Sequence, residues 1–115
     1  MDQTIKINEN KDFLAAYKRG KYICGKACTF YFRKNGKKFN RIGITTSKKV
    51  GNAVMRNRAR RIIRQAYREN EMNFPVGYDF VVVARDFAAE CKSGYISNFF
   101  EKKVIPDMIK TVNKK

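Results

Sequence analysis

Residues Ser47 to Gln65 read SKKVGNAVMRNRARRIIRQ, a run with two lysines, five arginines and no acidic residue. Placed on a helix from Asn52 to Asn70, the run separates into two faces, because residues three and four positions apart lie on the same side. The apolar face holds Met55, Ala59, Ile62, Ile63 and Ala66, with Tyr67 at its margin. The opposite face holds Asn57, Arg60, Arg61, Arg64 and Arg68, flanked by Arg56 and Arg58. We therefore expect one side of this helix to pack on a core and the other to meet a polyanion.

A helix and two strands are predicted before the basic run. Residues 10–19 (NKDFLAAYKR) have helical spacing of apolar residues, with Asn10 as the expected cap and Gly20 as the stop. Residues 22–33 are rich in aromatic and β-branched residues and alternate, so that Phe30 and Phe32 share one face and Tyr31 the other. Asn35-Gly36 predicts a hairpin turn, with residues 39–47 as the returning strand.

A strand and a helix are predicted after the basic run. Residues 78–85 contain the unalternated sequence FVVVA, which indicates a strand buried on both faces with a parallel neighbour. Residues 93–112 form an amphipathic helix for one face of the sheet, in which Pro106 predicts a kink or an early end. The order is helix, two or three strands, helix, strand, helix. It predicts an α+β fold, an α/β sandwich around one mixed sheet, as a single domain over residues 1–115.

The composition indicates a nucleic-acid partner. The 26 Lys and Arg against 10 Asp and Glu give a net charge of +16, which attracts polyanions. A membrane is the weaker alternative, because no apolar run approaches the roughly 20 residues that span a bilayer. The N-terminus also lacks the apolar core of a signal peptide, so we expect an intracellular protein.

Side-chain catalysis and metal binding find little support. The chain has no histidine and its ten acids are scattered, so neither a nucleophile with its base nor a carboxylate cluster can be named. Cys24, Cys28 and Cys91 are too few for a zinc site without histidine, and we expect reduced, mostly packed thiols.

Two smaller features are candidates for RNA contact. Residues 48–52 (KKVGN) predict a turn in which Gly51 permits a close backbone approach and free amides at the helix start hold a phosphate; an ordinary glycine turn is the alternative. Phe13, Tyr17 and Tyr31 are placed to line one groove, where stacking of unpaired bases is worth about 1–3 kcal/mol each. Pattern alone favours the simpler interpretation, that these aromatic residues belong to the core.

The run from Ser47 to Gln65, with Arg56-Asn57-Arg58 at its centre, resembles the signature of the protein subunit of bacterial ribonuclease P. The resemblance extends to residues 10–13 (NKDF), 41–45 (RIGIT) and 79–85 (DFVVVAR). It implies a four-stranded mixed sheet with about three helices in the order αβββαβα. It also implies a left-handed βαβ crossover through the basic helix, as in domains of certain ribosomal proteins.

The resemblance also implies a function and two sets of contact residues. The chain would assist a catalytic RNA, expected in a one-to-one complex, in removing the 5′ leader of precursor tRNA in the bacterial cytoplasm. Magnesium held mainly by the RNA would supply the chemistry, with no small-molecule substrate. The contacts to the catalytic RNA would be Arg56, Asn57, Arg58, Arg60, Arg61, Arg64 and Arg68. The contacts to the leader would be Phe13, Tyr17, Tyr31, Thr45, Ser47, Lys48 and Lys49.

Composition alone leaves two other functions open. A general RNA-binding or ribosome-associated protein would show an affinity that follows phosphate count and salt rather than leader length. A self-sufficient nuclease would cleave RNA when stripped of any RNA subunit.

Overall fold

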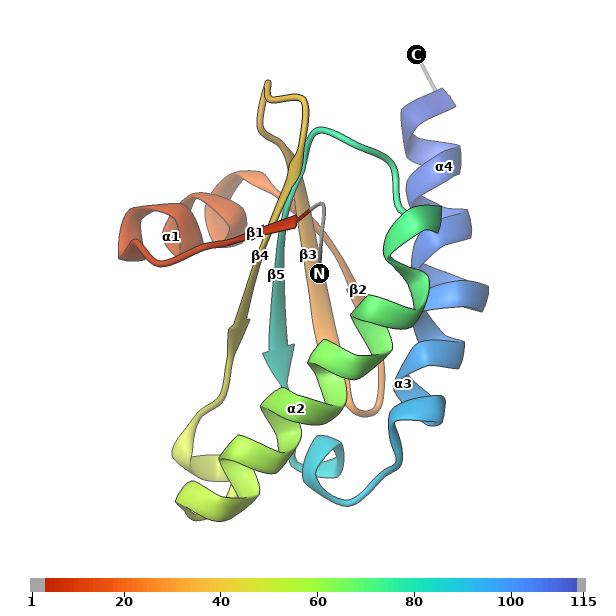
Figure 1. Ribbon diagram of the computed structural model, residues 1–115. Helices are drawn as coiled ribbons and strands as arrows, with labels where there is room; N and C mark the ends of the chain where they lie inside the picture. Colours follow the sequence, from red (N-terminus) through yellow and green to blue (C-terminus); the bar gives the residue numbers. More distant parts are fainter. Residues whose placement is uncertain (1–3, 114–115) are drawn as a thin grey trace.

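The computed structural model describes residues 4–113, with side chains up to residue 111. A single sheet is covered by helices on both faces (Figure 1). The strands are β1 (Thr4–Lys6), β2 (Lys21–Cys24), β3 (Cys28–Lys34), β4 (Asn40–Thr45) and β5 (Tyr78–Ala84). The α-helices are α1 (Asn10–Arg19), α2 (Ala53–Asn70), α3 (Ser93–Phe99) and α4 (Ile105–Asn113). Short 3-10 turns lie at Lys48–Val50, Glu71–Asn73 and Asp86–Ala89, and a π-helical turn at Phe100–Val104.

The sheet is mixed, as predicted, but has five strands in the order β1-β4-β5-β3-β2 rather than four. The strand missing from the prediction is β1, which has three residues and pairs in parallel with β4 alone. So short an edge strand carries no alternation to detect. The predicted strand over residues 22–33 is also divided, because the chain turns at residues 25–27 and β2 pairs antiparallel with β3.

The predicted hairpin between residues 22–33 and 39–47 is wrong. The Asn35-Gly36 turn is present, with Gly36 at φ +71°, but β3 and β4 do not pair. Strand β5 lies between them, antiparallel to β3 and parallel to β4. An Asn-Gly pair specifies a reversal of the chain and not which strands become neighbours. The central place goes to β5, whose residues are buried except for a partly exposed Val83.

The connection from β4 through α2 to β5 is left-handed, as the family resemblance implies. Figure 1 shows β4 and β5 running down the view with α2 in front of them and β5 to the right of β4. This hand is rare, because about 98% of such crossovers are right-handed. It places α2 with α3 and α4 on one face of the sheet and α1 on the other.

Helix α2 matches the helix predicted over residues 52–70, with small differences. Asn52 caps the helix, and its side-chain oxygen accepts the Met55 N–H at 3.0 Å. Ala59, Ile63 and Ala66 are buried as expected. Tyr67, expected at the margin, is fully buried, while Met55 is 37% exposed because the first turn of α2 extends past the sheet. In α1 the cap position belongs to Glu9 and not to Asn10, which is the first helical residue.

The last helix continues past Pro106 and ends at Asn113 rather than early. The π-helical turn immediately precedes α4, and the Ile105 N–H donates to the Phe100 carbonyl five residues back. A proline in a helix clashes with the carbonyl four residues earlier. The wider π turn accommodates this conflict locally, which explains why the helix is not broken.

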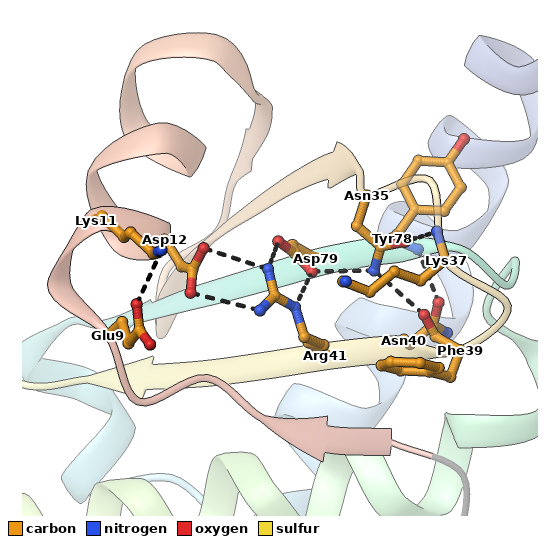
Figure 2. A network of polar contacts seen from close by, with 10 residues as sticks. All are labelled: Glu9, Lys11, Asp12, Asn35, Lys37, Phe39, Asn40, Arg41, Tyr78 and Asp79. Atoms are coloured by element: carbon orange, nitrogen blue, oxygen red, sulfur yellow. Dashed lines mark hydrogen bonds and ion pairs between the residues drawn. The ribbon is translucent and has the colours of Figure 1, made fainter.

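An ion network anchors α1 to the sheet (Figure 2). Arg41 of β4 donates from Nε and Nη2 to the two carboxylate oxygens of Asp79 on β5, at 2.8 and 2.6 Å. Its Nη1 and Nη2 also donate to Asp12 of α1 at 3.4 and 3.3 Å. Asn35 donates to Asp79 at 3.0 Å. Burial raises the pKa of Asp79, but the bonds from Arg41 and Asn35 outweigh it and hold that pKa below its ordinary value.

We predict that Asp79→Asn destabilises the fold by about 3 kcal/mol. The Asp79 side chain is 2% exposed, and removing one partner of a buried ion pair leaves the other uncompensated. Urea unfolding gives the measurement, and Glu101→Gln, at an exposed acid of the π turn, is the control. Equal midpoints for the two variants would contradict the prediction.

The same pair predicts a pH dependence. The folded pKa of Asp79 lies below the unfolded value of about 3.9, so its stabilisation is complete above that value and is lost as pH falls. The stability difference between wild type and Asp79→Asn should be constant from about pH 5 to 7 and shrink below about pH 4. A difference that grew on acidification would show that the sign is wrong.

Candidate RNA interface

The basic face of α2 is directed away from the sheet. Arg58, Arg61 and Arg68 are exposed, while Arg56, Arg60 and Arg64 are partly buried. Within residues 4–111 none of the six forms an ion pair, since the three salt bridges there involve Lys11 and Arg41. Their mutual repulsion is therefore not relieved by acidic neighbours in this part of the chain.

Three of the predicted contacts to the catalytic RNA, Asn57, Arg58 and Arg60, also take part in internal hydrogen bonds. Arg58 donates from Nε to the Ala89 carbonyl at 2.9 Å, which ties α2 to the turn after β5. Asn57 accepts from Arg60 Nη1 at 3.1 Å. Arg58 therefore positions the neighbouring turn as well as presenting charge.

Grooves lie on both sides of the arginine face. An open groove of about 720 Å³ between α2 and the start of α3 is lined by Arg58, Arg61, Arg64 and Arg68 with Cys91, Lys92 and Ser93. A smaller one of about 100 Å³ lies between α2 and the β1–β4 edge, where Arg60 and Arg64 face Lys6. Lys92 and Lys6 extend the basic surface and were missed from the sequence, because neither belongs to the helical run.

The aromatic residues expected to line a groove do meet on the α1 face of the sheet. Tyr17 of α1 and Tyr31 of β3 have ring centroids 5.0 Å apart in an edge-to-face arrangement. The Phe13 ring covers Gly43 of β4, where an added Cβ would come within 2.6 Å of it. Tyr17 is 38% exposed, and Phe13 and Tyr31 are partly buried. We give the name cleft to the partly open surface that these three side chains form between α1 and the sheet.

Tyr22 completes this cluster and was missed from the sequence. Its ring centroid lies 5.6 Å from that of Tyr31, because the two residues are directly paired across β2 and β3. Treating residues 22–33 as one strand concealed this pairing. The turn at Gly25-Lys26 was the signal that divides the strand in two.

The four polar residues predicted as leader contacts follow one another from the end of β4 into the turn before α2. Thr45 ends β4 on the same face as Gly43. Ser47 is exposed, and its Oγ accepts the Lys49 N–H at 3.3 Å in the turn that presents Lys48 and Lys49 to solvent. Gly51 has φ +138°, a conformation that favours glycine, and a side chain there would meet Met55. The Met55 amide, one of those considered for phosphate binding, is occupied by Asn52.

The cysteines are free thiols, with Cys28 and Cys91 buried and Cys24 exposed. Burial and the neighbouring Cys91 raise the pKa of Cys28 to about 12. Within the described residues no three Cys, Asp or Glu side chains are grouped so that they could hold a metal ion. Nor is any helix in that part of the chain both long and apolar enough to cross a bilayer.

A basic helix face together with partly exposed aromatic rings is typical of proteins that bind RNA. The comparisons with known proteins identify the family. The chain matches the family described as Ribonuclease P over residues 1–105. The ribonuclease P protein component of Clostridium botulinum (strain Langeland) is 44% identical over 82 residues, which cover 70% of this chain and 74% of the relative. That of Thermoanaerobacter sp. (strain X514) is 30% identical over 111 residues, which cover 96% of each.

Solved structures agree with the sequence relatives. The Staphylococcus aureus RNase P protein superposes with a TM-score of 0.75 at 31% identity, over 91% of this chain and 94% of that one. The Thermotoga maritima RNase P protein gives 0.65 at 29% identity, over 96% of both. The chain belongs to the ribonuclease P protein family, as the Arg-Asn-Arg signature indicated. It is a subunit of a tRNA-processing ribonucleoprotein nuclease.

We predict that Gly43→Ala displaces the Phe13 ring and destabilises the fold by about 1–3 kcal/mol, the usual cost of overpacking. Gly94→Ala is the matched control, because nothing lies within 4 Å of a Cβ at that helical position. Thermal unfolding of both variants gives the measurement. A Gly43→Ala protein as stable as Gly94→Ala would show that Phe13 is not held against β4.

Proposed function

We propose that the arginine face of α2 binds the catalytic RNA and that the cleft binds the 5′ leader of precursor tRNA. The observation that carries the proposal is the placement of these surfaces on opposite faces of one sheet. Helix α2 belongs to the layer on one face, and α1 with Tyr31 belongs to the other. One protein can therefore hold two RNA segments at the same time.

The charge of α2 supports its contact with a folded RNA. The six arginines Arg56, Arg58, Arg60, Arg61, Arg64 and Arg68 lie along one 18-residue helix, together with Asn57. Arginine suits this role because its planar guanidinium binds phosphate through two parallel hydrogen bonds. Lys6 and Lys92 broaden the face toward its neighbouring grooves.

The cleft supports contact with an unpaired strand. Phe13, Tyr17 and Tyr31 present rings on which bases stack regardless of sequence, as suits leaders that differ among precursor tRNAs. Thr45, Ser47, Lys48 and Lys49 follow one another from the end of β4 into the turn before α2, where hydroxyl and ammonium groups suit a phosphate backbone. We assign that segment to the nucleotides nearest the cleavage site.

We assign the hydrolysis itself to magnesium ions held mainly by the catalytic RNA. The acids nearest the cleft do not suit a metal site, because Asp12 and Asp79 both bind the Arg41 guanidinium. The residues of this chain would hold the leader and the RNA, leaving a mature 5′ end on the tRNA. We place one copy of the chain with one RNA, in the bacterial cytoplasm.

Two combined variants should separate the surfaces. Replacing Arg60, Arg61 and Arg64 with glutamine should weaken binding of the catalytic RNA. It should also make the affinity for that RNA less dependent on salt concentration, because fewer phosphates are neutralised. Phe13→Ala with Tyr31→Ala should instead weaken binding of leader-bearing precursor by about fivefold or more while mature tRNA is affected little. Filter binding of each RNA to the protein and to the reconstituted holoenzyme gives both affinities.

Unfolding curves of both variants provide the control for folding. Adding wild-type protein to the catalytic RNA should also lower the magnesium concentration needed for precursor cleavage. Equal losses of both affinities in both variants would argue against separate surfaces. A chain that changed neither leader affinity nor the magnesium requirement would contradict the proposal as a whole.

A further inference from the structure

The cleft continues beyond Tyr31 to the edge of the sheet. Gly43, Val81, Tyr31 and Tyr22 occupy one row across four strands, because each residue pairs with the next in the register. Adjacent strands lie about 4.8 Å apart, so the row spans roughly 14 Å from β4 to β2. Phe13 covers the Gly43 end. Tyr22 stands at the other end, on the edge strand.

The Tyr22 ring has one supported side and one open side. It packs against Tyr31 at a centroid distance of 5.6 Å and an interplanar angle of 38°. It is nevertheless 62% exposed, more than any other tyrosine of the cleft. A ring positioned by a neighbour and open to solvent is the arrangement on which an unpaired base stacks.

A basic groove lies round the edge of the sheet from Tyr22, on the face that carries α4. It lies between β2 and α4, measures about 380 Å³, and includes Lys21, Tyr22, Asp107 and Lys110 in its lining. A second hollow of about 280 Å³ shares Lys21 with it and adds Arg19, Arg33 and Lys34. Asp107 is the one acid in the two linings, against five basic residues. A phosphate backbone leaving Tyr22 therefore enters a positive field.

We propose that Tyr22 and this groove between β2 and α4, the edge groove, extend the cleft and bind leader nucleotides farther from the cleavage site. A base stacks on the open side of Tyr22, and the phosphates beyond it lie beside Lys21 and Lys110. The inference rests on the proposed leader role of the cleft. It adds a second segment of the leader path, which the Arg-Asn-Arg signature does not include.

The experiment uses holoenzyme reconstituted with a bacterial catalytic RNA and precursor tRNAs whose leaders lengthen one nucleotide at a time. Wild-type affinity should rise in two stages, the second when a nucleotide reaches Tyr22. Tyr22→Ala should reduce the ratio of long-leader to short-leader affinity by about fivefold, the effect of one lost stacking contact. Tyr22→Phe, which keeps the ring, should restore the ratio. Tyr95→Ala, at a tyrosine on α3 that is 46% exposed, should leave it unchanged.

The edge groove has its own measurement. The logarithm of the binding constant falls linearly with the logarithm of salt concentration, with a slope set by the number of phosphate contacts. Lys21→Gln with Lys110→Gln should make this slope shallower by about 0.7 per lost contact, for long leaders only. Lys102→Gln with Lys103→Gln, at two exposed lysines of the π turn, is the matched control for net charge.

The outcomes distinguish this inference from the function on which it rests. A wild-type affinity with no second stage, or an unchanged ratio in Tyr22→Ala, would overturn the inference alone. Tyr22→Ala could instead alter self-association of the protein and leave the ratio of long-leader to short-leader affinity unchanged. That result would assign the exposed edge at β2 to a protein contact and would also overturn the inference. If Phe13→Ala with Tyr31→Ala left every leader length unaffected, the leader role of the cleft would fail instead.

Discussion

Strand β5 imposes the constraint from which the arrangement of this protein follows. Its side chains are apolar toward both faces except for Asp79, which is paired with Arg41, and all but Val83 are buried. A central strand of this kind must be covered by a layer on each side. Helices α2, α3 and α4 cover the face of Phe80 and Val82, and α1 covers the face of Val81. Two outward surfaces, separated by the sheet, are the consequence.

The two layers are held by different interactions. The larger layer rests on an aromatic core in which Phe30, Phe74 and Phe80 have ring centroids within 5.6 Å of one another. Within the residues that the structure describes, the smaller layer has one 10-residue helix, with Ala16 as its buried side chain. This helix is anchored by polar contacts, because Arg41 donates hydrogen bonds to Asp12 on the helix and to Asp79 on β5. Because α1 packs through so few apolar side chains, the aromatic rings between it and the sheet remain partly open to solvent.

The elements with a strong periodic pattern could be predicted from the sequence. Helices α1 and α2 lie within one residue of their expected bounds, and β5 was recognised by its unalternated run. The neighbours of β5 could not be predicted, because an Asn-Gly turn shows where the chain reverses and not what inserts between its strands. Among the site residues, Phe13, Tyr17 and Tyr31 were candidates for one groove, although their pattern alone favoured the core and the family resemblance supplied their role, whereas Tyr22 depends on strand register. Register arises from tertiary packing, which local pattern does not encode.

The separation of the surfaces also limits how they influence each other. The two surfaces lie on opposite faces of the sheet, and salt screens the interaction of exposed charges through solvent beyond about 8 Å at physiological ionic strength. Neutralising the arginines with RNA therefore changes the field at the cleft only modestly. Close packing of the core also resists continuous deformation between the two faces. If the two surfaces bind as proposed, we expect cooperation between the catalytic RNA and a bound leader to arise mainly from contacts between the RNAs, with the protein holding both in place.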